Sequence, residues 1–120
     1  MIADALSRES DVVFAYLHGS FVGTLPFHDI DVAIYFGGGL SPYTQRIVEL
    51  ADRLTSQLGY PIDVRALNDA SLSFAFRAMQ GELLLSRDDE CLADVLERTG
   101  RRYLDIAPIL RRATRDAFAS

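Results

Sequence analysis

The feature that most constrains this chain is the run from Asp29 to Phe36, in which two aspartates alternate with apolar residues. The alternation has the period of a β-strand and places four apolar side chains on one face, namely Ile30, Val32, Ile34 and Phe36. Asp29 and Asp31 then share the other face, where two neighbouring carboxylates repel each other unless a cation or water screens them. Mg²⁺ prefers carboxylate oxygens and leaves positions open for phosphate. The run therefore predicts a strand with one core face and one metal-binding face.

A second part of the same site is expected just upstream. The apolar run 12–17 predicts a strand that ends at His18, Gly19 and Ser20. A glycine and a hydroxyl at a strand end allow backbone N–H groups to approach a phosphate closely. A plain turn explains Gly19 and Ser20 about as well when they are taken alone. Together with the two aspartates on the next strand, they favour a phosphate-binding turn.

A third carboxylate is expected from a later strand. In the segment 61–67, apolar residues alternate with Asp63 and Arg65, so these two side chains share the face opposite the core. If this strand pairs with the one that carries Asp31, Asp63 joins the other two aspartates. Three solvated strand aspartates at a sheet edge are the alternative interpretation, but their spacing after the Gly-Ser turn favours a metal site.

Four other polar residues near these motifs receive more ordinary interpretations. His18 and His28 flank the turn, and each is expected to be a hydrogen-bonded strand-end or loop histidine rather than a catalytic group. Arg46 and Arg65 are candidates for contact with a triphosphate, although surface charge is the expected role of both.

These motifs resemble the minimal nucleotidyltransferases of the DNA polymerase β-like superfamily, whose pattern is Gly-Ser, a spacer, Asp-x-Asp and a later third Asp. Here the spacer after Ser20 is shorter than usual, and His28 stands where the family commonly has Ser. The resemblance implies Mg²⁺ as the metal and ATP as co-substrate. It implies that Asp29, Asp31 and Asp63 are the catalytic, metal-binding residues, and that Gly19 and Ser20 bind the nucleotide.

The resemblance also implies a fold and a partner. The fold is α+β, a single polymerase β-like domain over residues 1–120 with a small mixed sheet, helices packed on it and a C-terminal helical region. The segments 81–88 and 103–105 resemble the ends of small nucleotidyltransferases that act as antitoxins beside HEPN-domain toxins. This implies a protein adenylyltransferase that transfers AMP to the hydroxyl of a tyrosine in a HEPN ribonuclease toxin. Two alternatives stay open: an antitoxin that acts by binding alone, and an enzyme that modifies a small hydroxylated molecule such as an aminoglycoside.

Composition limits the partners and the setting. A chain of 120 residues is one ordinary domain, and its net charge of -5 argues against unaided binding to a long nucleic acid. The single Cys91 cannot form an intramolecular disulfide, and no apolar stretch is long enough to predict a membrane span. We therefore expect a cytoplasmic protein, and homo- or hetero-oligomer formation is left open.

Four helical regions are expected around the strands. A short helix covers 2–6, and a longer one begins with Ser41 as N-cap and Pro42 as first helical residue and ends at Gly59. Asn68 and Asp69 are expected to cap a third helix, which is closed by Gly81 and followed by a strand over 82–86.

The last helical region is expected from Cys91 to the C-terminus, divided near Gly100 and Pro108. The acidic run 88–90 is interpreted as the favourable charge of a first helical turn rather than as a metal cluster. An apolar stripe is expected to pack on the core, with a partner groove as the alternative. It comprises Leu104, Ile109, Leu110, Ala113 and Ala117.

Overall fold

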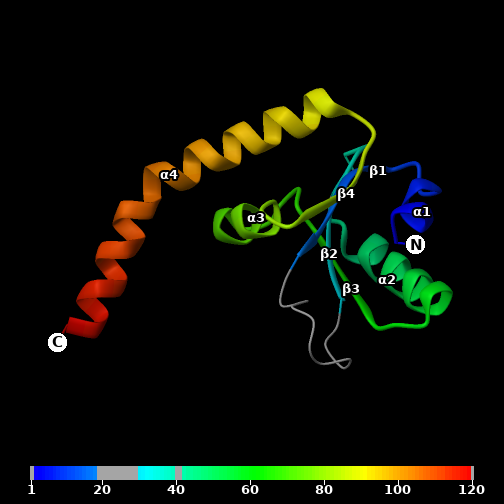
Figure 1. Cartoon of the computed structure of the whole chain (residues 1–120), viewed down its shortest axis with the longest axis horizontal. Coiled ribbons are helices and arrows are strands. Elements are labelled where there is room, and N and C mark those ends of the chain that lie inside the picture. The colour runs from blue at the N-terminus through cyan, green and yellow to red at the C-terminus, as the bar shows by residue number, and fades with distance from the viewer. Residues whose placement is uncertain (1, 19–29, 40–41, 120) are drawn as a thin grey trace.

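The computed structural model describes residues 2–18, 30–39 and 42–119, which form four helices and four strands. In chain order these are α1 (Ile2–Ser7), β1 (Val12–His18), β2 (Ile30–Phe36), α2 (Thr44–Leu58), β3 (Ile62–Ala66), α3 (Leu72–Ala78), β4 (Glu82–Ser86) and α4 (Asp89–Ala119). The strands make one mixed sheet in the order β3-β2-β1-β4, in which β1 is antiparallel to β2 and β4. Strands β2 and β3 are parallel. The expected α+β fold with a small mixed sheet and a C-terminal helical region is confirmed (Figure 1).

Both faces of the sheet carry an apolar cluster. On one face, α1 and α2 pack Leu6, Leu50 and Leu54 against the alternate residues Val32 and Ile34 of β2. On the other face, residues of α3 and of the first turns of α4 pack against β1 and β2. This second cluster contains Phe14, Tyr16, Ala33, Ala75, Ala78, Leu92 and Val95. Among the described residues, α3 and α4 therefore cover the face that carries Asp31 over much of its length and leave it open toward one end.

Helix α2 ends as expected but begins later than the sequence suggested. Gly59 is its C-cap with φ 74, the left-handed conformation that favours glycine. Its first residue is Thr44, so the prediction that Pro42 is the first helical residue is wrong, and Ser41 lies outside the described residues. Tyr43 takes the N-cap position without a side-chain cap and is buried against Phe36, with ring centroids 5.4 Å apart. Burial of this aromatic ring thus fixes the helix start.

Helix α3 is capped by a residue that the sequence pattern did not select. Ser71 Oγ accepts a hydrogen bond from the N–H of Phe74 at 3.2 Å, so the predicted Asn68-Asp69 cap is wrong. The Asn68 amide instead bonds the main chain of Phe36 in both directions, at 2.9 and 2.8 Å. It therefore extends the junction of β2 and β3 beyond the last strand residue. The helix ends at Ala78, before the predicted stop at Gly81.

Helix α4 is longer and more continuous than expected. It runs unbroken through Gly100 and Pro108, so the predicted division is wrong. Its ribbon bends in its orange part (Figure 1). At its start, Asp88 Oδ1 accepts a hydrogen bond from the Cys91 N–H at 3.0 Å, which agrees with a capping role for this acidic run. No helix in the described ranges is long and apolar enough to cross a membrane.

The predicted packing of the apolar stripe fails at its first residue. Leu104 is 68% exposed, because the distal part of α4 extends away from the sheet (Figure 1). The side chains of Ile109, Leu110, Ala113 and Ala117 lie outside the described part of the chain.

Candidate active site

The structure brings together two of the three predicted carboxylates. In the parallel pairing of β2 with β3, Asp31 is the direct partner of Asp63, so both stand on the same face of the sheet. In the antiparallel pairing of β1 with β2, Asp31 is also the direct partner of His18. The predicted residues Gly19, Ser20 and Asp29 lie outside the described residues, as does His28.

Burial on the opposite face fixes this register. Val32 and Val64, each one position beyond an aspartate, are direct partners and are almost fully buried. A slip of one residue would turn Asp31 or Asp63 into the apolar core and Val32 or Val64 into solvent. Asp63 keeps 49% of its side chain exposed, which leaves its carboxylate accessible.

A hollow of about 290 Å³ lies beside Asp31. It is lined by His18 and Asp31 from the sheet, by Arg65 from β3, and by Phe74 and Arg77 from α3. Phe74 is central, because the His18 ring meets it edge-on with centroids 5.0 Å apart and the Arg65 guanidinium lies 5.2 Å above its ring. Sequence reasoning missed Phe74 and Arg77, since both lie in a predicted helix and nothing in the sequence marked either as a site residue.

The charges around the hollow are only loosely paired. Arg65 Nε lies 3.7 Å from Asp63 Oδ2, and both side chains are about half exposed, so water screens this contact. Within the described residues Asp31 forms no ion pair. The site thus presents one carboxylate without a close cation and a second with a weak one.

The surroundings of His18 favour its neutral form by lowering its pKa. Burial lowers its pKa, nearby Arg65 and Arg77 lower it further, and Asp31 and Asp63 act in the opposite direction. Its Nε2 is buried and has no hydrogen-bond partner among the described residues, contrary to the expected hydrogen-bonded histidine. A neutral imidazole leaves the adjacent Asp31 free to bind a cation.

The donor set fits a hard divalent cation. Asp31 and Asp63 offer carboxylate oxygens from adjacent strands, the ligand type that Mg²⁺ prefers. The described residues contain no cluster of three or more metal-binding side chains, and Asp29, the predicted third carboxylate, lies outside them. The two aspartates are thus the described part of a candidate metal centre.

Arg46 has neither of the two roles that the sequence suggested for it, which were contact with a triphosphate and surface charge. Its guanidinium contacts Asp11 through Nε at 2.7 Å and Nη2 at 2.8 Å, and it reaches Glu9 at 2.7 Å. Only 19% of its side chain is exposed. It is therefore a part-buried structural cation rather than a surface charge or a triphosphate contact.

Comparison with known proteins gives both a family match and a fold match. A sequence model described as "Polymerase beta, Nucleotidyltransferase" matches residues 1–90. A crystal structure of a mutant toxin-antitoxin MntA-HpeT aligns with TM-score 0.77 and 22% identity, over 99% of this chain and 96% of that one. The MNT antitoxin in complex with tri-AMPylated HEPN toxin of Shewanella oneidensis aligns with TM-score 0.73 and 20% identity, over 98% and 96%.

A third structure, of a toxin-antitoxin with AMP-PNP, aligns with TM-score 0.75 and 22% identity, over 98% of this chain and 95% of that one. At identities this low, the structural likeness establishes the fold. No curated protein matches the sequence.

Proposed function

The chain belongs to the polymerase β nucleotidyltransferase family, and we propose that it is an antitoxin-type protein adenylyltransferase. It transfers AMP from ATP to the hydroxyl of a tyrosine in a cognate HEPN ribonuclease toxin. The observation that carries the proposal is the direct pairing of Asp31 with Asp63 at the open end of a sheet face. It is supported by the fold, which is shared with an MNT antitoxin solved in complex with a tri-AMPylated HEPN toxin.

In this proposal Asp31 and Asp63, with Asp29 two positions before Asp31, hold Mg²⁺. When bound, Mg²⁺ neutralises the charge of the triphosphate and lowers the pKa of the attacking hydroxyl. The carboxylates fix the cation on a rigid strand pair, because Val32 and Val64 anchor the register from the other face. Gly19 and Ser20 bind the phosphates through backbone N–H groups and the serine hydroxyl.

The other residues of the hollow orient and shield the nucleotide. Arg65 and Arg77 line the hollow from β3 and α3 and would face the negative charge of a triphosphate bound there. Phe74 forms an apolar wall, which excludes water and strengthens the electrostatic contacts beside it. Burial lowers the pKa of His18, which reduces its competition with a cation for Asp31.

The size of the site favours a protein acceptor. Its hollow of about 290 Å³ lies at the lower limit of the roughly 300–1,000 Å³ that enclose drug-sized ligands. The domain has no additional lobe in its described part that would hold a small acceptor over the aspartates. An acceptor that brings its own binding surface, namely another protein, suits such an open site.

The decisive experiment is intact-mass spectrometry of the HEPN partner after incubation with this protein, ATP and Mg²⁺. We expect a mass gain of one or more AMP units, lost in Asp31→Asn and in Asp63→Asn and retained in Asp52→Asn, a control at an exposed acid of α2. A stable complex without any mass gain would instead indicate neutralisation by binding alone. Absence of both would direct the search to small hydroxylated acceptors.

A further inference from the structure

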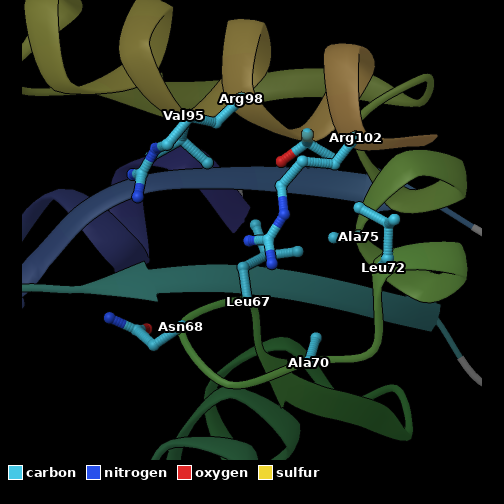
Figure 2. Close-up of a pocket in the computed structure, with 9 residues that line it drawn as sticks. Leu67, Asn68, Ala70, Leu72, Ala75, Val95, Arg98 and Arg102 are labelled. Carbon is cyan, nitrogen blue, oxygen red and sulfur yellow. The ribbon is translucent and has the colours of Figure 1, made fainter. Parts of the chain in front are cut away.

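A second hollow, of about 210 Å³, lies between α3, α4 and the loop that follows β3 (Figure 2). It is on the same side of the sheet as the candidate active site, since Ala75 and Val95, which belong to the apolar cluster there, form part of its wall. It shares no lining residue with the hollow beside Asp31. The nucleotidyl transfer proposed above makes no use of it.

The charge in this hollow has a single sign. Arg98 and Arg102 lie one turn apart on α4, and both side chains reach from the helix toward the loop that carries Leu67 and Asn68 (Figure 2). Among the residues that the structure describes, no acidic side chain lines the hollow.

Four of the arginines whose side chains the structure describes lie within 4 Å of a carboxylate, namely Arg46, Arg53, Arg65 and Arg101. The other described arginines, which include Arg98 and Arg102, form no such ion pair with a described residue. Arg101, which is on the same helix as Arg98 and Arg102, pairs with Glu97 one turn earlier. The hydrogen-bond donors of Arg98 and Arg102 are therefore available for a ligand.

Two neutral polar groups complete the lining. Thr99 lies between the two arginines in sequence and is a buried polar residue, with 9% of its surface exposed. Asn68 is held in place by its two hydrogen bonds to Phe36, which use one of the two N–H groups of its side-chain amide and leave the other. The lining thus offers guanidinium, hydroxyl and amide donors, and its remaining members are apolar.

We propose that this hollow is a binding site for a small oxyanion of the phosphate class, held by Arg98 and Arg102. Arg98 and Arg102 are both exposed residues at the edge of the hollow, and guanidinium groups bind phosphate through paired, charge-assisted hydrogen bonds. Donors on several sides suit a tetrahedral anion better than the planar carboxylate of a partner's acidic side chain. The volume is below the roughly 300 Å³ at which drug-sized ligands are enclosed, so the bound group is phosphate, pyrophosphate or the phosphate end of a nucleotide.

Isothermal titration calorimetry on the full chain tests this proposal. EDTA is present, so that metal-dependent nucleotide binding near Asp31 does not contribute, and the probes are inorganic phosphate, pyrophosphate and AMP in separate titrations. We expect saturable binding of at least one probe, weakened roughly tenfold by Arg98→Gln and by Arg102→Gln and further by the double variant. Binding of AMP but not of the inorganic anions would identify a nucleotide phosphate as the source.

The matched control is Arg101→Gln, an exposed arginine of the same helix that already has a carboxylate partner, and its affinity should equal that of the wild type. Asp31→Asn should also leave the affinity unchanged, which separates this site from the proposed catalytic one. Absence of saturable binding to all three probes would overturn the proposal, and so would equal weakening in Arg101→Gln.

A further result would also overturn it. If the folded double variant lost affinity for the HEPN partner while the wild type bound none of the three anions, the arginines would be contacts for a protein surface. Thermal unfolding of each variant shows whether it is folded. A lower melting temperature with unchanged anion binding would assign to Arg98 and Arg102 only the packing of their aliphatic stems over the apolar wall.

Discussion

The two ends of strand β1 differ in whether the acidic side chains near them have a cation partner. Just before its first residue, Asp11 forms two hydrogen bonds with the Arg46 guanidinium, at 2.7 and 2.8 Å. At its last residue, His18 faces Asp31, which has no cation partner among the described residues, and Asp31 in turn faces Asp63. Near the first residue of β1, an ion pair holds neighbouring elements together. Near its last residue, the charge of Asp31 has no cation partner among the described residues.

The pKa shifts follow the same division. Hydrogen bonds from Arg46 lower the pKa of Asp11, although burial opposes them. For Glu9, burial raises the pKa, but hydrogen bonds from Arg46 and Arg53 outweigh it and the pKa is lowered. Near the aspartates it is the neutral form of His18 that burial favours. Carboxylates that stabilise the fold are thus closely paired, whereas of those proposed to bind ligand Asp31 has no ion pair with a described residue and Asp63 has only the half-exposed contact with Arg65.

The largest expected effect separates the two ends by activity. Asp31→Asn should reduce AMP transfer about a thousandfold or more, roughly 4 kcal/mol in barrier terms, because it removes a metal ligand and its charge. Its free energy of unfolding should stay within about 0.5 kcal/mol of the wild type, since no ion pair to a described residue is lost. Single-turnover kinetics and urea unfolding measure the two quantities. Near-normal turnover would contradict the assignment of Asp31 to the catalytic site.

The second change should act on stability instead. Arg46→Gln leaves Glu9 and Asp11 part-buried without their main cation and should cost about 2–4 kcal/mol in the free energy of unfolding. Arg53→Gln is the control, because Arg53 is 46% exposed and its ion pair with Glu9 is worth less than about 1 kcal/mol. Equal losses in the two variants, measured by urea unfolding, would show that burial does not decide the contribution of this cluster.

A third change tests the backbone that positions the open end. A Cβ atom on Gly81 would lie 2.1 Å from the carbonyl oxygen of Leu17, the residue before His18. Gly81→Ala should therefore shift β4 against β1 and cost about 1–3 kcal/mol. Gly100→Ala is the counterpart, since nothing lies within 4 Å and loss of a helical glycine should stabilise by about 0.5–1 kcal/mol. If the unfolding curves of Gly81→Ala and Gly100→Ala shifted in the same direction, this would contradict the close approach of a Cβ atom at position 81 to the Leu17 carbonyl.

The smallest expected effect is a dependence of stability on pH. It falls in two pH windows, an upper one set by His18 and a lower one set by Asp11 and Glu9. Burial lowers the pKa of His18 from 6.5, so its contribution to stability is full above that pH and is lost as the pH falls toward the lowered value. Asp11 and Glu9 have lowered pKa values, from 3.8 and 4.5, so their contribution is full above these values and is lost at more acidic pH.

Thermal melts from pH 8 to pH 3 measure both windows. His18→Phe should remove the upper window and leave the lower one. Arg46→Gln should flatten the lower window and leave the upper one. Loss of both windows in a single variant would mean that the two ends of β1 are not independent.

Much of this arrangement was predictable from local patterns. The period-2 alternation around Asp31 and Asp63 placed both carboxylates on one face, because a strand has no other way to bury Val32 and Val64. Gly59 marked a helix end, because it adopts a backbone conformation that other residues avoid. These predictions depend on one or two neighbouring residues and on simple stereochemistry.

The wrong predictions concern residues whose role depends on distant partners. Asn68 looks like a helix cap in the sequence, but it bonds Phe36, thirty-two positions away. Arg46 looks like a surface charge until Asp11 comes within 2.7 Å of it. Leu104 has the spacing of a buried stripe, yet α4 carries it away from the core. Each outcome depends on the tertiary arrangement and not on the neighbouring sequence.

The sequence by itself determined the strands, the face that holds the aspartates and the family pattern, because side-chain alternation and glycine stereochemistry act over a few residues. Only the tertiary structure decided that Asp31 would face Asp63 and His18, that Phe74 and Arg77 would close one side of the hollow, and that Arg98 and Arg102 would line a second one. Strand order and helix placement bring together residues far apart in the chain, and that choice is made by burial of the whole apolar surface rather than by any local segment.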